Sequence, residues 1–265
     1  MQFTTANGVV HHYQVIGGPE GKPTFVFVNS LGTDFRIWRD VIVKLVGEYG
    51  IVLYDKRGHG LSALGETPYK VETLASDLAG LLDGLGVDNA IVVGLSVGGL
   101  IAQCLVRERP DLVRALVLIG TAAKIGDDAM WPERIAAVKE SGVAPLLDGV
   151  MAKWFTPAFH QNRPDDLAGY RTMVERQPQA GYVATCEALR DADLRVDAPD
   201  IKVPTICVVG DQDGSTPPKT VLELARSIPD ARYEVIQGAA HIPCVETPDY
   251  LVEIIRAFLK DAEIA

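Results

Sequence analysis

Ser96 lies in Gly94-Leu95-Ser96-Val97-Gly98, which matches the pattern G-x-S-x-G. The apolar run "AIVVG" precedes the serine, and residues 97–110 repeat apolar residues at helical spacing. A sharp turn from strand to helix pushes its central residue toward positive φ, and side chains two positions before and after it would collide across the turn. This turn predicts an exposed serine nucleophile at a helix start. The simpler alternative is a glycine-rich turn with Ser96 as the helix N-cap.

A serine hydroxyl is a weak nucleophile that needs a base, and the base needs an acid to orient it. With this strand-turn-helix arrangement the expected chain order is serine, acid, histidine. Only His160 and His241 follow Ser96 among the five histidines. His241 comes just after the last predicted strand, so it is the expected base. Its alternative role is to cap the helix that begins near Pro248.

The acid is expected in the loop "VVGDQDGSTPP", which follows the penultimate strand and offers Asp211 and Asp213. Asp213 is further from the strand end and can reach across to His241, so the sequence favours Asp213. Asp211 is the alternative, and its other role is to organise the loop by accepting backbone N–H groups.

A tetrahedral intermediate needs hydrogen-bond donors for its oxyanion. The N–H of Val97 is available at the start of the predicted helix. The second donor is expected in "NSLGTDF", after the strand "TFVFVN". Leu31 N–H is the candidate, with Gly32 allowing close approach. The alternative is an ordinary loop that contains a glycine.

Short apolar runs alternate with helical patterns along most of the chain. Residues 24–29, 50–55, 90–94, 115–120, 205–210 and 232–236 read as strands buried on both faces. Residues 71–86, 97–110, 219–230 and 248–262 read as helices. Two alternating segments, 2–5 and 9–16, flank Asn7-Gly8 and predict a hairpin. The class is therefore α/β, with a mostly parallel sheet and helices on both faces.

Residues 121–199 interrupt this alternation, because they contain no convincing strand. Three stretches, 132–155, 165–176 and 180–194, read as helices. An ordinary connection between strands is far shorter. We therefore expect a core formed by residues 1–121 and 199–265, and a helical cap formed by residues 122–198.

The composition excludes several classes of function. A formal net charge of −10 and the lack of a long basic run argue against nucleic acid or an anionic membrane as a partner. No G-x-G-x-x-G follows a strand, which argues against a dinucleotide-binding oxidoreductase. The four cysteines form no CxxC pair, and no Cys/His cluster has metal-ligand spacing. The start "MQFTTANGVVHH" does not resemble a secretory signal, and no apolar stretch is long enough for a membrane helix. We therefore expect a cytoplasmic protein with reduced thiols and no metal.

The sequence resembles the α/β-hydrolase fold family, and within it the 3-oxoadipate enol-lactonases. The resemblance covers nearly the whole chain, including "NSLGTDFRIW", "YDKRGHGLS", "GLSVGGLIAQ", "VVGDQDGSTPP" and "GAAHIPCVETP". Two segments in or beside the cap, "KWFTPAF" and "ALRDADL", are more specific to the lactonases. Many relatives have His-Gly where this chain has Asn29-Ser30, a change that looks shared with the enol-lactonases.

The resemblance implies an eight-stranded sheet and the hydrolysis of an enol-lactone to 3-oxoadipate in the catabolism of aromatic compounds. Ser96 would attack the lactone carbonyl, His241 would act as base, and Asp213 would orient it. No metal or organic cofactor is needed. The small-molecule substrate also carries a free carboxylate, which requires a cation or a cluster of donors in the site.

The candidate cations in the cap are Arg134, Arg171 and Arg190. Arg134 follows Trp131 on a predicted helix and is the first choice, whereas the alternative for each arginine is a solvated helix face. Trp131 and Trp154 are expected to wall the pocket or, alternatively, to pack the cap onto the core. His59, in "RGHGLS", resembles a structural loop of the family and is given no chemical role.

Three other functions are compatible with these residues. A carboxylesterase or a cofactor-free perhydrolase of the haloperoxidase type would use the same three residues on another substrate. A ligand receptor with little turnover is a different class, against which an intact Ser96, Asp213 and His241 argue. Dehalogenases of this fold place aspartate at the position of Ser96, which makes that activity a poor fit.

Overall fold

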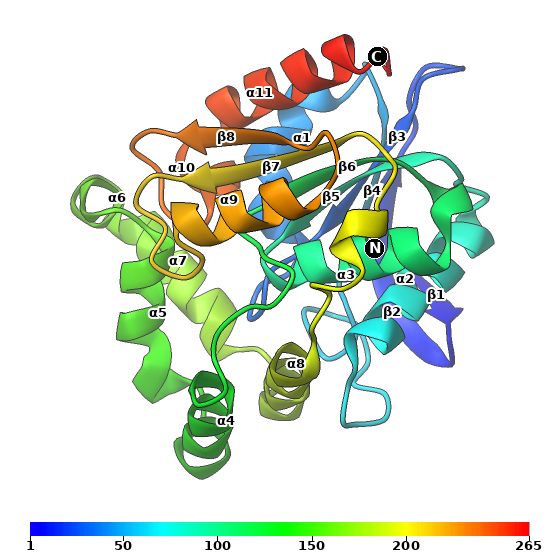
Figure 1. The fold of residues 1–265 in the computed structure, drawn as a ribbon. Coiled ribbons are helices and arrows are strands. Elements are labelled where there is room, and N and C mark those ends of the chain that lie inside the picture. Colours follow the sequence, from blue (N-terminus) through cyan, green and yellow to red (C-terminus); the bar gives the residue numbers. More distant parts are fainter. Residues whose placement is uncertain (265) are drawn as a thin grey trace.

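The computed structural model describes residues 1–264 and contains one eight-stranded sheet (Figure 1). Its spatial order is β1-β2-β4-β3-β5-β6-β7-β8. β1 and β2 form an antiparallel hairpin, β2 pairs antiparallel with β4, and all other neighbours are parallel. This confirms the predicted sheet. The strands are β1 (Gln2–Ala6), β2 (Val9–Ile16), β3 (Thr24–Val28), β4 (Gly50–Tyr54), β5 (Ala90–Leu95), β6 (Val113–Ile119), β7 (Thr205–Gly210) and β8 (Arg232–Ile236).

Burial explains why these strands are so apolar. β4, β5 and β7 are buried at every residue, as expected for parallel strands covered on both faces. The expectation that residues 232–236 form such a strand is wrong in this respect. β8 is the edge of the sheet, and exposed or half-buried residues alternate along most of it. In the N-terminal hairpin Asn7 and Gly8 both have positive φ, 48° and 74°, which a tight primed turn requires.

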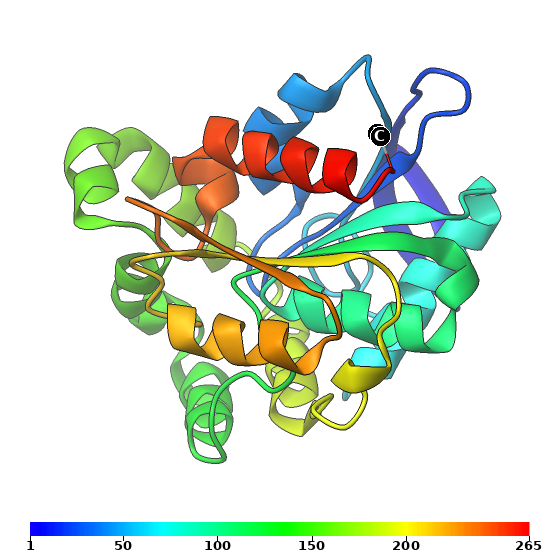
Figure 2. The ribbon, with the colours of Figure 1, turned by 45° about the horizontal axis from the view of Figure 1, so that its top comes forward.

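Helices cover both faces of the sheet (Figures 1 and 2). α1 and α11 pack together on one face, while α2, α3 and α9 lie on the other. The chain has buried free thiols at all four of its cysteines. Among the described helices, none is both long and apolar enough to cross a membrane. The core helices are α1 (Arg39–Leu45), α2 (Val71–Leu85), α3 (Val97–Glu108), α9 (Pro218–Ser227), α10 (Pro243–Glu246) and α11 (Pro248–Asp261).

Five further helices follow β6 and precede β7, where the sequence predicts an insertion without strands. In Figure 1 they lie to the left of and below the sheet, and α5 to α7 lie on the side toward which the β7 and β8 arrows point. They are α4 (Met130–Ser141), α5 (Leu147–Trp154), α6 (Pro157–Asn162), α7 (Pro164–Glu175) and α8 (Gln179–Asp191). The expected helix over 132–155 is wrong, because Gly142 has φ +75° and ends α4 before a short 3₁₀ turn at Ala144–Leu146.

The topology brings the candidate site residues to one edge of the sheet. Leu31 follows β3, Ser96 follows β5, Asp213 follows β7 and His241 follows β8. These four strands run parallel, so their carboxyl ends face the same way. Strand order reverses around β3, which pairs with β4 on one side and with β5 on the other. Open α/β sheets bind ligands at the carboxyl edge beside such a reversal.

Candidate active site

Ser96 occupies the turn between β5 and α3 in a backbone conformation that is unfavourable for serine. Its φ is 57° and its ψ is −118°, outside the favoured regions for a residue with a Cβ. Hydrogen bonds hold the turn: Ser96 N donates to Ile119 O at 2.9 Å, and Thr121 Oγ1 donates to Ser96 O at 2.7 Å. A backbone conformation that costs free energy and is nevertheless held in place by its surroundings is typical of a functional site.

The glycines around Ser96 are required for two different reasons. A Cβ on Gly94 would collide with the backbone of Gly98 across the turn, as the sequence predicts. A Cβ on Gly98 would instead collide with the carbonyl of Val28, at the end of β3. The expected collision across the turn is therefore wrong for Gly98, since the neighbouring strand is the obstacle.

Asp213 and His241 form a buried pair. His241 Nδ1 lies 2.8 Å from Asp213 Oδ2, and both side chains are almost completely inaccessible to solvent. Asp213 Oδ1 accepts the N–H groups of Ser215 and Thr216 at 2.7 and 2.9 Å, and Oδ2 accepts the Thr216 hydroxyl at 2.9 Å. Burial alone would raise the pKa of Asp213, but the His241 charge and these bonds hold it below its usual value. Asp213 is therefore held as a carboxylate facing His241.

Asp211 has a different set of partners. Its Oδ1 accepts the N–H groups of Gly238 and Ala239 at 2.8 and 3.3 Å. These bonds fix the loop that leads to His241, which is the organising role considered above as the alternative for this residue. Asp213, not Asp211, contacts the histidine.

Gly120, directly after β6, was not singled out from the sequence. Its φ is +48°, and a Cβ there would lie 3.0 Å from Asp213 Oδ2 and 3.1 Å from His241 Nδ1. Contacts this short would press on the pair, so glycine leaves room for it. The only signal in the sequence is a glycine at the end of a buried strand, which is too common to identify this role.

The helical insertion fixes the His241 loop directly. The N–H groups of His241 and Ile242 both donate to the carbonyl of Trp154, at 3.1 and 3.3 Å. Glu246 bridges the same two parts, because it accepts from Ala240 N at 2.6 Å and from Thr156 N at 2.9 Å. Trp154 thus contributes through its backbone as well as its side chain.

Ser96 and His241 line a common pocket, together with Leu31 from the loop after β3. No hydrogen bond joins Ser96 Oγ to His241 within residues 1–264, and such bonds commonly tighten only when substrate is bound. Gly32 has φ +76°, and a Cβ there would press on Val174 and Tyr182 of the helical insertion. The positive φ and the lack of space for a Cβ both explain why this position is a glycine.

Val97 is the first residue of α3, so its N–H has no hydrogen-bond acceptor within the helix.

Two cations line this pocket, and no carboxylate of the described residues does. Arg134 lies in α4, with its guanidinium carbon 5.5 Å from the centre of the Trp131 ring. Lys153, in α5, was not predicted. Neither forms an ion pair within the part of the chain that the structure describes. Trp131 and Trp154 also line the pocket.

The other two candidate arginines do not line the pocket. Arg171 pairs with Asp148 and Arg190 pairs with Asp191, each at a partly exposed position. Both arginines therefore lie on solvated helix faces, the alternative considered for them above.

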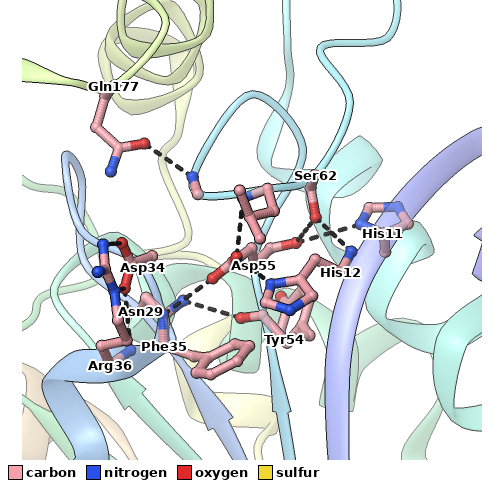
Figure 3. A network of polar contacts seen from close by, with 12 residues as sticks. His11, His12, Asn29, Asp34, Phe35, Arg36, Tyr54, Asp55, Ser62 and Gln177 are labelled. Atoms are coloured by element: carbon pink, nitrogen blue, oxygen red, sulfur yellow. Dashed lines mark hydrogen bonds and ion pairs between the residues drawn. The ribbon is translucent and has the colours of Figure 1, made fainter. Parts of the chain in front are cut away.

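A larger cavity of about 510 Å³ lies elsewhere, between the loops after β3 and β4 and helix α7. Figure 3 shows a network of polar contacts that includes some of its lining residues, among them His12, Asp34 and Asp55. The carboxylate of Asp55 accepts hydrogen bonds from His12 Nδ1 at 2.8 Å, from Phe35 N at 2.9 Å and from Leu61 N at 3.0 Å. Gly60 N donates to Gln177, from the helical insertion, at 2.9 Å. No serine or cysteine of residues 1–264 lines it, whereas Ser96 lines the smaller pocket.

The chain is similar to several known proteins. Residues 23–248 match the family model for the alpha/beta hydrolase fold. The chain is 33% identical to 3-oxoadipate enol-lactonase 2 of Acinetobacter baylyi, over 97% of this chain and 95% of that protein. It is 35% identical to the enol-lactonase from Burkholderia xenovorans LB400, whose crystal structure superposes with a TM-score of 0.94 over 98% of this chain and 100% of that one. A pimeloyl-[acyl-carrier protein] methyl ester esterase of Aeromonas hydrophila is 26% identical, over 89% of this chain and 95% of that protein.

Proposed function

The chain belongs to the alpha/beta hydrolase fold family, and from this premise we propose that it opens the lactone ring of 3-oxoadipate enol-lactone to give 3-oxoadipate. The observation that carries the proposal is the pocket itself. The strained Ser96, the buried His241 and two cations all line it, and none of its described lining residues is a carboxylate. A neutral ester gains nothing from such cations, whereas a lactone with a free carboxylate does. The reaction would belong to the catabolism of aromatic compounds.

The first half of the reaction forms an acyl-enzyme. Ser96 Oγ attacks the lactone carbonyl while His241 Nε2 takes its proton, and Asp213 holds the imidazole through Nδ1–H. The N–H groups of Leu31 and Val97 stabilise the oxyanion. The C–O bond to the enol oxygen breaks as His241 returns its proton to that oxygen. This leaves the substrate's acyl carbon on Ser96, the enol on the same molecule, and His241 neutral again.

Hydrolysis of that ester completes the reaction. His241 removes a proton from water, the hydroxide adds to the acyl carbon, and the proton returns to Ser96 as the second carboxylate is released. The enol tautomerises to the ketone of 3-oxoadipate. An enolate is a better leaving group than a saturated alkoxide, so the demand on acid catalysis is modest. The residues supply every group that these steps use.

The helices of residues 122–198 would act as a cap that supplies specificity. They contribute Arg134, Lys153 and Tyr182 to the pocket, while the core contributes Ser96 and His241. Burial raises the pKa of Tyr182 to about 12, with the charge of Arg134 opposing the shift. Tyr182 is therefore a neutral donor beside a cation at neutral pH.

Substrate class is tested by comparing kcat/KM for the enol-lactone derived from muconolactone with that for p-nitrophenyl acetate. The expected ratio favours the lactone by at least about a hundredfold, because only the lactone has a carboxylate for the cations. A lactone turned over no better than the simple ester would favour a carboxylesterase or perhydrolase on the same residues.

Removal of the cations tests how the carboxylate is bound. Arg134→Met keeps the apolar stem against Trp131 but removes the charge, and we expect it to raise KM for the lactone by about tenfold to a hundredfold. Lys153→Met is the matched variant for the second cation. KM for p-nitrophenyl acetate serves as the control and stays unchanged in both. An unchanged lactone KM in both variants would rule out these cations as the carboxylate contact.

A further inference from the structure

The peptide unit between Ser30 and Leu31 has two polar groups with different surroundings. Leu31 N–H, the proposed oxyanion donor, has no acceptor within residues 1–264. The carbonyl of the same unit, Ser30 O, accepts a hydrogen bond from Lys56 Nζ at 2.6 Å. It also accepts from Thr33 Oγ1 at 3.0 Å and Thr33 N at 3.3 Å. One planar amide therefore lies between a lysine ammonium and the oxyanion position.

Lys56 is in an unusual position for a lysine. Its side chain is 2% exposed, and it forms no ion pair with any described carboxylate. Burial lowers the pKa of Lys56 to about 7, although the charges of Asp55 and Asp34 oppose the shift. The side chain is therefore a cation in about half of the molecules at pH 7 and in most of them at lower pH. Desolvating a cation to reach a carbonyl that Thr33 already satisfies costs stability. A gain in stability does not explain the residue.

The neighbouring histidine holds the other side of Leu31. Gly32 N donates to His59 Nε2 at 3.0 Å, and His59 Nδ1 faces the carbonyl of Arg57 at 3.4 Å. Burial, together with the charge of Lys56, lowers the pKa of His59 well below its usual value. A neutral ring with its proton on Nδ1 can accept the Gly32 N–H, whereas a charged ring cannot.

The segment that carries Lys56 and His59 is itself firmly held. Asp55, directly before Lys56, accepts three hydrogen bonds from the hairpin and from both adjoining loops (Figure 3). Ser62 Oγ donates to Asp55 O at 2.5 Å and accepts from His12 N at 2.9 Å. Asn29, directly before Ser30, bonds Tyr54 O and Trp38 Nε1. The ammonium and the peptide therefore meet in a fixed geometry.

We propose that Lys56 is a positioning residue for ester and lactone hydrolysis, which orients and polarises the Leu31 N–H through the Ser30–Leu31 peptide. A cation on the carbonyl oxygen increases the double-bond character of the C–N bond and the positive charge on the N–H. The gain is largest when negative charge develops on the substrate oxygen, so it acts on the transition state more than on bound substrate. The proposal rests on the proposed function, because it requires that oxyanion.

Lys56→Met is the test, because methionine has a similar length and no charge. We expect kcat to fall about tenfold to a hundredfold, with KM for the lactone within about twofold of the wild type. The free energy of unfolding at pH 7 should be no lower than that of the wild type, because a desolvated charge is removed and Thr33 still satisfies Ser30 O. A lower stability with unchanged kcat per folded enzyme would mean a structural role and overturn the proposal.

A boronic acid that forms a tetrahedral adduct with serine gives an independent readout. The affinity of Lys56→Met for this probe should fall by the same factor as kcat, while its affinity for the product 3-oxoadipate, whose carboxylate carbons are trigonal and not tetrahedral, stays unchanged. Equal losses for both ligands would overturn the proposal. If Lys56→Met does not fold, Lys56→Gln also removes the charge and has the same expected and contradicting results.

Arg57→Met is the matched control, since Arg57 is also buried and charged but pairs with Asp77 instead of the oxyanion loop. We expect it to be less stable than the wild type, with unchanged kcat per folded enzyme. A loss of kcat equal to that of Lys56→Met would overturn the specific role of Lys56. Ser96→Ala separates the two proposals: an active Ser96→Ala defeats the proposed function, whereas an inactive one beside a fully active Lys56→Met defeats only this inference.

Discussion

Ser96→Ala is expected to lower kcat by a factor of about 10⁵ or more for both the lactone and p-nitrophenyl acetate. The acyl-enzyme cannot form without the hydroxyl, and the remaining N–H donors stabilise only the slow direct attack of water. Alanine has the same Cβ as serine, so the strained φ of 57° and the fold are retained. Initial rates and the thermal unfolding midpoint measure the two effects separately.

The same variant also addresses the receptor alternative. A receptor would keep its ligand affinity and its low turnover after Ser96→Ala, with no change in rate. For an enzyme, we expect Ser96→Ala to retain its affinity for 3-oxoadipate and to lose turnover. Residual activity above about 1% of the wild type would contradict the role of Ser96 as nucleophile.

Asp213→Asn is expected to lower kcat by about 10⁴ with little effect on stability. Oδ1 of Asp213 accepts two backbone N–H groups, so the asparagine oxygen would take that place and its NH₂ would face His241 Nδ1. Nδ1 must then act as the acceptor, which moves the histidine proton to Nε2. That nitrogen can no longer take the proton of Ser96. The pH dependence of kcat and the unfolding midpoint are the measurements.

Asp211→Asn is the matched control for this prediction. Its amide oxygen can still accept the N–H groups of Gly238 and Ala239, so kcat is expected to stay within about twofold of the wild type. A larger loss from Asp211→Asn than from Asp213→Asn would transfer the acid role to Asp211.

Much of the core could be predicted because its signals are local. Runs apolar at every position arise where both faces of a strand are covered, and this pattern found β4, β5 and β7. The glycines around Ser96 identified the turn, since no other residue fits there. The reason for Gly98 could not be predicted, because the obstacle belongs to β3, far away in the sequence.

The pocket was harder to predict because its walls come from separate helices. Helical periodicity located most of the insertion, but Gly142 divides one expected helix into two. Lys153 therefore lines the pocket from α5 and Arg134 from α4, whereas Arg171 and Arg190 pair with aspartates. The spacing of apolar residues identifies the apolar face of a helix, but it does not identify the element that packs against that face.

The burial of Lys56 could not be predicted from the sequence. Lysine is almost never fully buried, so "YDKRGHGLS" gives no reason to place its ammonium inside the protein. Its contact with Ser30 O depends on the pairing of β3 with β4, which brings the ends of two strands together. The sequence predicts the strands before both segments, but the contact between the segments follows only from the pairing of those strands in the folded protein.

Hydrolysis through an acyl group on Ser96 can be detected by mass spectrometry of protein quenched in acid during turnover. We expect p-nitrophenyl acetate to add one acetyl group, located on the peptide that contains Ser96. Ser96→Ala, treated in parallel, should show no added mass and no turnover. An acetyl group on another residue, or turnover that persists in Ser96→Ala, would contradict hydrolysis through Ser96.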